Sequence, residues 1–160
     1  MVNLAKELVP QIEAHEGAIC GEIDHVNKLT RSLFQPNDMI LCRTSAPLVG
    51  LCMKLIENGI SAVVKGKDIA QGLLNLIENA NTDNIDNLLK YLNNEKQKMI
   101  AVIKSERKCS DSDAMESARY RNLDDRCKCI ENICLYHLKD TKQLKMYVSV
   151  LFTDERIKML

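Results

Sequence analysis

Residues 38–66 constrain the fold more than any other stretch, because their pattern is typical of a strand, a turn, a helix and a second strand. The short apolar run at 39–42 predicts a buried strand, and the β-rich run at 60–64 predicts another. Between them, Pro47 suits a first helical turn, and Asn58-Gly59 predicts the end of that helix. A unit of this kind implies a parallel sheet whose strands are joined by a right-handed crossover.

The helix of this unit has an apolar face with helical spacing, formed by Leu48, Leu51, Cys52, Leu55 and Ile56. In parallel sheets, ligands bind at the loops that follow the carboxyl ends of the strands. Arg43, Thr44 and Ser45 follow the first predicted strand directly. We therefore expect these three residues at the functional edge of the sheet.

Composition narrows the class of protein. The chain has 160 residues, 46% of them hydrophobic, which allows one ordinary domain or a small domain with an insertion. Lys plus Arg and Asp plus Glu number 22 each, so nucleic-acid or membrane binding would need a local patch. No apolar run approaches the roughly 20 residues of a membrane span. The odd count of 7 cysteines favours reduced, mostly buried thiols in a cytoplasmic protein.

The rest of the first half predicts short elements around this unit. Residues 3–17 read as a helix with Leu4, Leu8 and Ile12 on one face, residues 18–25 as a weak edge strand, and 26–34 as a short helix. After Gly66, Asp68 is the candidate N-cap of a helix whose apolar face is Ile69, Leu73, Leu76 and Ile77.

The second half is helical throughout. One stripe contains Ile85, Leu88, Leu89, Leu92, Met99, Ile100 and Ile103, interrupted only by Lys96, and Thr82 or Asn84 would cap it. A second stripe contains Ala118, Leu123, Cys127, Ile130, Cys134, His137 and Leu138. The polar stretch 110–113 between the stripes predicts a turn and cap, hence an antiparallel helical hairpin. Asp140 or Thr141 would cap a last helix with Leu144, Tyr147, Val148 and Leu151. The predicted fold class is α/β, with a small parallel-sheet core at 1–79 and a helical arm at 80–160.

Signatures of catalysis are missing from the sequence. It contains no Gly-x-x-x-x-Gly-Lys-Ser/Thr loop, no Gly-x-Gly-x-x-Gly turn and no Asp-Glu pair after an apolar strand. We therefore expect no nucleotide hydrolysis and no cofactor in this chain alone. His15 and His25 have no nucleophile or carboxylate arranged around them and are expected to be solvated or to cap helices.

The best metal candidates are Cys127, Cys129, Cys134 and His137. Their spacing lacks the Cys-x-x-Cys pairs of zinc sites, and they continue the apolar stripe. A structural role in the core is the favoured interpretation, and no metal site is predicted.

Basic residues occur in two groups. Those of the arm (Lys96, Lys98, Lys104, Arg107, Lys108, Arg119, Arg121, Arg126 and Lys128) alternate with acids, so an ion-paired, solvated surface is the favoured interpretation. Those near the predicted sheet are Arg43, Lys54, Lys65 and Lys67. Arg43 differs from the rest, because an arginine beside hydroxyl groups at a strand end suits contact with phosphate.

Three segments resemble a known family: Ile-Leu-Cys-Arg-Thr-Ser-Ala-Pro-Leu at 40–48, Leu-Ile-Glu-Asn-Gly-Ile at 55–60 and Val-Lys-Gly-Lys-Asp-Ile at 64–69. They are similar to the second RecA-like motor domain of UvrD-like DNA helicases, which carries a helical insertion after such a unit. The similarity is specific over residues 36–74.

The resemblance implies that Arg43 contacts the backbone of single-stranded or partly duplex DNA and that Thr44 donates a hydroxyl. Ser45 replaces the family's usual Asn, and Lys65 and Lys67 complete the predicted DNA-binding set. The resemblance also implies that this chain is part of a longer helicase, and that the parent protein binds ATP and Mg²⁺.

Two further possibilities stay open. The chain is alternatively a non-catalytic helical module that binds protein or forms homo-oligomers, because an incomplete sheet would leave apolar surface exposed. A small zinc protein is the third possibility.

Overall fold

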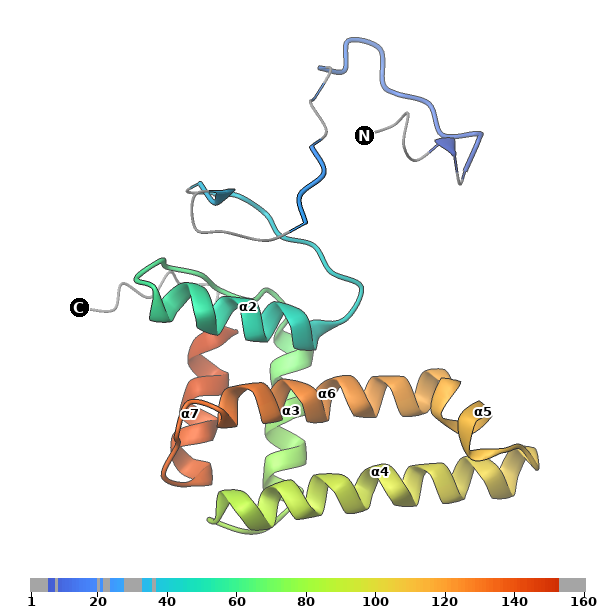
Figure 1. Ribbon diagram of the computed structural model, residues 1–160, viewed down its shortest axis with the longest axis vertical. Coiled ribbons are helices and arrows are strands. Elements are labelled where there is room, and N and C mark those ends of the chain that lie inside the picture. The colour runs from blue at the N-terminus through green and yellow to red at the C-terminus, as the bar shows by residue number, and fades with distance from the viewer. Residues whose placement is uncertain are drawn as a thin grey trace. The chain divides into compact units, whose positions relative to one another are not determined.

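The computed structural model describes residues 6–7, 9–19, 21, 24–27, 33–35 and 37–152. The chain divides into two compact units, Met1–Asp38 and Met39–Leu160. Across the described residues the structure contains helices and no β-strand or sheet (Figure 1). The predicted α/β fold class with a parallel-sheet core is therefore wrong, and the second unit is all-helical.

The described part of the first unit consists of turns and exposed coil. One turn is closed by a hydrogen bond from the backbone N–H of Ala18 to the carbonyl of His15, at 3.0 Å. His15 and His25 are both exposed. The described residues of the predicted strand at 18–25 form no strand. The predicted helix at 3–17 is wrong over its described residues 9–17, which form turns and coil, whereas Leu4 and Leu8 lie outside the described residues.

The two predicted strands of residues 38–66 are connections without regular secondary structure. Met39 is 76% exposed and Leu41 82% exposed, whereas a strand in a parallel sheet would bury both. In the second run Val64 is buried, and its backbone N–H donates to the carbonyl of Leu151 at 2.9 Å. A strand requires a ladder of such bonds with a neighbouring strand. A short apolar run alone cannot distinguish a strand from a connection that places one residue in a core.

The helix between these runs, α2 (Ser45–Glu57), begins and ends as predicted. Pro47 lies in its first turn, and Gly59 follows its end at a φ of 73°. Its buried face differs from the predicted one, however. The buried residues are Ala46, Val49, Cys52, Met53 and Leu55. Leu48, Leu51 and Ile56 are only half-buried, because the helix packs on other helices and not on a sheet.

Helix α3 (Lys67–Asn79) begins at Gly66, two residues before the predicted cap Asp68. Gly66 has a φ of 147°, which side chains rarely adopt. A Cβ atom there would also lie 2.7 Å from Cδ1 of Ile69. Glycine is therefore required at this position, and Leu73 and Ile77 form the buried face of the helix.

The predicted helical hairpin is present as α4 (Ile85–Arg107) and α6 (Ala118–Cys134), which are joined by the short α5 (Asp111–Glu116). Figure 1 shows α4 and α6 side by side, with α5 at one end of the pair. Asn84 caps α4 by accepting a hydrogen bond from the backbone N–H of Asn87 at 3.0 Å. Ser110 and Asp113 form a capping box at α5. Asp140 caps the last helix, α7 (Thr141–Leu151).

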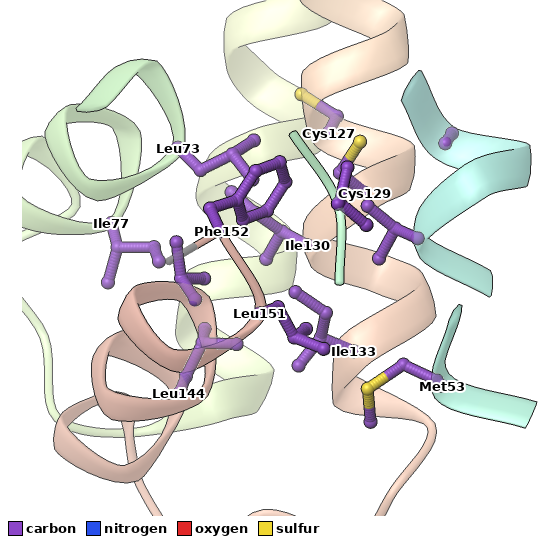
Figure 2. Packing of buried hydrophobic residues seen from close by; sticks show 14 of the residues in the cluster. Met53, Leu73, Ile77, Cys127, Cys129, Ile130, Ile133, Leu144, Leu151 and Phe152 are labelled. Atoms are coloured by element: carbon purple, nitrogen blue, oxygen red, sulfur yellow. The ribbon is translucent and has the colours of Figure 1, made fainter. Parts of the chain in front are cut away.

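Helix α6 is the centre of the second unit, because it contacts α2, α3, α4, α5 and α7. Figure 2 shows Ile130 and Ile133 of α6 in one cluster with Leu73 of α3 and Leu144 of α7. Phe152, which directly follows α7, belongs to the same cluster. The same cluster includes residues of α2 and α4. This cluster therefore joins helices from 1–79 to helices from 80–160.

Lys96, which interrupts the apolar stripe of α4, has partners on α6. Its ammonium group lies 3.2 Å from Oε1 of Glu131 and 3.8 Å from Oδ1 of Asp124, and its side chain is 16% exposed. The stripe therefore tolerates a charge because acids of the opposite helix neutralise it.

Candidate nucleic-acid interface

Arg43, Thr44 and Ser45 form the turn that leads into α2. Arg43 and Thr44 are exposed, and Ser45 is half-buried as the first residue of the helix. Thr44 occupies the N-cap position, but its side chain makes no capping hydrogen bond. The amides at this helix end therefore need another acceptor.

Asp125 of α6 supplies that acceptor. The backbone N–H of Ser45 donates to its Oδ2 at 2.8 Å, and that of Ala46 donates to its Oδ1 at 2.9 Å. A second link comes from Asn132, whose side-chain amide donates to the carbonyl of Ala46 at 2.9 Å. Helix α6 thus fixes the position of this turn through residues about 80 positions away in the sequence.

This arrangement limits what the turn can do chemically. The free N–H groups of a helix N-terminus are a ready site for phosphate. Here a carboxylate already occupies the amides of Ser45 and Ala46. Contact between the turn and an anion must therefore come from the guanidinium of Arg43 and from hydroxyl groups. The backbone N–H of Ser45 is already bonded to Asp125, so only its hydroxyl group can contact a ligand.

The turn forms one wall of a groove of about 500 Å³, which we call the arginine groove. Helix α6 supplies Arg121 and Arg126 to the same groove. Its full lining is Arg43, Thr44, Ser45, Ile69, Glu116, Ala118, Arg121, Asn122, Asp125 and Arg126. Of the predicted DNA-binding residues, the structure brings Arg43, Thr44 and Ser45 to this groove. Lys65 and Lys67 are exposed and do not line it.

Arg126 is positioned by close contact with α3. A Cβ atom at Gly72 would lie 3.0 Å from the guanidinium carbon of Arg126, so the guanidinium lies against the bare backbone of that glycine. The side chain is half-buried. Gly72 inside a helix was the sequence signal for such a contact, because glycine lets another group approach the backbone closely.

Arg43, Arg121 and Arg126 differ in their ion pairing from most cations of the helical hairpin. Lys96, Lys98, Lys104, Arg119 and Lys128 all pair with neighbouring acids, as the alternating charges predict. Within the part of the chain that the structure describes, no ion pair involves Arg43, Arg121 or Arg126. The groove also contains two carboxylates, Glu116 and Asp125, and both oxygens of Asp125 accept hydrogen bonds from amides. The result is a local basic site on a chain with no net charge.

The metal candidates Cys127, Cys129, Cys134 and His137 do not line this groove. Cys127 and Cys129 are fully buried in the core, and Cys134 packs against it. Burial raises the pKa of Cys127 and Cys134 to about 11 and that of Cys129 to about 12. His137 follows the end of α6 with a φ of 54°. Since metals bind the thiolate, this setting favours the structural interpretation of these residues.

No three His, Cys, Asp or Glu side chains are placed to hold a metal ion in the described part of the chain. Among the described residues there is also no helix with the length and apolar character needed to cross a bilayer. No family model, curated protein or solved structure matches this chain.

Proposed function

We propose that this chain is a non-catalytic segment of a DNA helicase that binds the backbone of single-stranded DNA in the arginine groove. The observation that carries the proposal is the convergence on one groove of Arg43, Arg121 and Arg126, which form no ion pair with any described residue. Guanidinium groups match phosphate oxygens in geometry and charge, and they contribute more than neutral hydrogen bonds. The resemblance supports DNA as the ligand, since it implies a backbone contact at Arg43 and Thr44. ATP and Mg²⁺ belong to the parent helicase in this proposal.

The proposal differs from the sequence-based expectation in its site. The proposed site contains Arg121 and Arg126 of α6 in place of Lys65 and Lys67, and it does not include a parallel sheet. The six described cysteines are free thiols, which supports a location in the reducing cytoplasm.

The test is fluorescence anisotropy with a labelled single-stranded oligonucleotide over a range of salt concentrations. Three phosphate contacts predict a slope of log affinity against log salt of about −2, at about 0.7 per contact. Arg43→Ala and Arg121→Ala should each weaken binding and reduce that slope by about 0.7. Glu116→Gln should tighten binding, because it removes the groove's exposed negative charge.

Arg107→Ala is the matched control, because Arg107 is an exposed arginine on α4 that does not line the groove. It should bind like the wild type. Equal losses from Arg107→Ala and Arg43→Ala would mean that any surface cation suffices. Wild-type affinity for both groove variants would remove the groove from the function.

A second candidate function is self-association through residues 39–41. Met39 and Leu41 are 76% and 82% exposed in a short apolar run, and an exposed apolar run can pair with the same run of a second chain. Sedimentation velocity at several concentrations tests it. Leu41→Asp should shift an oligomer to monomer, and a wild-type chain that is monomeric at all concentrations rules the candidate out.

A further inference from the structure

A second hollow, of about 510 Å³, lies beside the arginine groove between α4 and α6. Its lining is Met99 of α4 and Ala118, Arg119, Asn122, Leu123 and Arg126 of α6. Three of these six residues are apolar, whereas five of the ten residues that line the groove are charged. We call this feature the apolar hollow.

The two features form one continuous surface. Ala118, Asn122 and Arg126 line both of them, and their spacing of four residues makes them a single ridge along α6. A ligand that crosses this ridge meets guanidinium groups on one side and Met99 and Leu123 on the other. It must therefore carry an anionic group and an apolar surface close together.

The charges set the direction in which such a ligand lies. Arg119, a cation of the apolar hollow, is paired with Glu106 at 2.6 Å. Arg43 and Arg121, which belong to the groove alone, have no ion-pair partner among the described residues. The anionic part therefore belongs in the groove and the apolar part in the hollow.

We infer that one unpaired base of the bound strand enters the apolar hollow, while its phosphate lies in the arginine groove. The inference rests on the proposed function and deepens it, because it assigns α4 and α6 a contact with the base. In a nucleotide the phosphate and the base are close neighbours, as the two features require. Met99 and Leu123 offer an apolar surface for the face of the base, and the amide of Asn122 offers a donor and an acceptor for its edge. A duplex keeps its base faces stacked, so only an unpaired base can enter.

The test compares two labelled strands of equal length and charge, an oligothymidylate and an abasic strand, by fluorescence anisotropy at one salt concentration. The wild-type chain should bind the oligothymidylate at least about 5-fold more tightly, which is the lower end expected for one stacked base. Met99→Ser and Met99→Gln should each weaken binding of the oligothymidylate and leave the abasic strand unchanged, because Met99 lines the hollow and not the groove. Met99 is half-buried and Gln is close to Met in length, so Met99→Gln keeps the test informative if Met99→Ser fails to fold.

Val102→Ser is the matched control, because Val102 is an exposed apolar residue of α4 that lies outside the hollow. It should retain the preference for the oligothymidylate. Equal affinity of the wild type for both strands, with both still weakened by Arg43→Ala, would overturn the base site and leave the groove standing. Absence of binding to either strand would overturn the proposed function and this inference together.

Discussion

Asp125 is the residue whose removal tests the architecture most directly, because its carboxylate joins α6 to the start of α2. Asp125→Ala leaves the backbone N–H groups of Ser45 and Ala46 without the acceptors that they have at 2.8 and 2.9 Å. Hydrogen bonds to a charged group contribute about 1.5–3 kcal/mol each, and loss of a helix cap typically costs about 1 kcal/mol. The site is only partly buried, so water replaces some of what is lost. We expect Asp125→Ala to lower the free energy of unfolding by about 2–3 kcal/mol.

Asp125→Asn separates the charge from the hydrogen bonds. The amide has one acceptor oxygen and no charge, so it can satisfy one N–H group but not attract the helix end electrostatically. Its expected cost is about 1–2 kcal/mol, between the wild type and Asp125→Ala. Asp83→Asn is the matched control. Asp83 is 3.6 Å from Lys142, and both side chains are more than 70% exposed. Such a pair contributes less than about 0.5 kcal/mol.

The measurement is urea unfolding followed by far-ultraviolet circular dichroism, because the chain has no tryptophan. Amide hydrogen exchange at Ser45 and Ala46 should accelerate in both Asp125 variants. The reasoning is refuted if Asp125→Ala unfolds at the same urea concentration as Asp83→Asn, because the contact between α6 and α2 would then carry no free energy.

Three further perturbations follow from the same structure. Gly66→Ala should lower the free energy of unfolding by about 1–3 kcal/mol, because the residue has a φ of 147° and its new Cβ would contact Ile69. Urea unfolding measures this, and a midpoint equal to that of Gly21→Ala would contradict it. Lys96→Met should change stability by less than about 1 kcal/mol, since its aliphatic stem is kept and Asp124 retains Lys128; a loss above about 3 kcal/mol would show that Lys96 is indispensable to the α4–α6 contact. Burial raises the pKa of Cys52, Cys127 and Cys134 from 9.0 to about 11 and that of Cys129 to about 12, so above pH 9 the folded chain holds these protons while the unfolded chain releases them. Stability should therefore be unaffected by these thiols below about pH 9 and fall as the pH rises toward 11, and a melting temperature that is constant from pH 8 to 10.5 would contradict this.

Helices of the second unit were the predictable part of this fold. Asn84 and Asp140 cap helices where their side chains predict it, and Asn58-Gly59 ends α2. The two stripes of apolar residues correctly indicate the hairpin of α4 and α6. These features depend on contacts within about four residues, because the hydrogen bonds of a helix are internal to it.

The strands were not predictable in this way. Residues 39–42 and 60–64 have the composition of strands, but a strand exists only when another segment pairs with it. The prediction of the buried face of α2 was wrong for a related reason. Val49 and Met53 are buried because α6 packs across that side of the helix, and periodicity within α2 could not choose between neighbouring faces.

The candidate site divides along the same line. The sequence by itself determined that Arg43 is an exposed cation at the start of a helix, because the turn and the helix are local features. Only the tertiary structure decided that Arg121 and Arg126 join it, and that Asp125 occupies the amides of Ser45 and Ala46. Those contacts connect residues about 80 positions apart, and their formation depends on which helix faces share the core. The physical reason is that hydrogen bonds between residues close in the sequence determine where a helix forms, whereas burial of its apolar face determines which other helices it packs against.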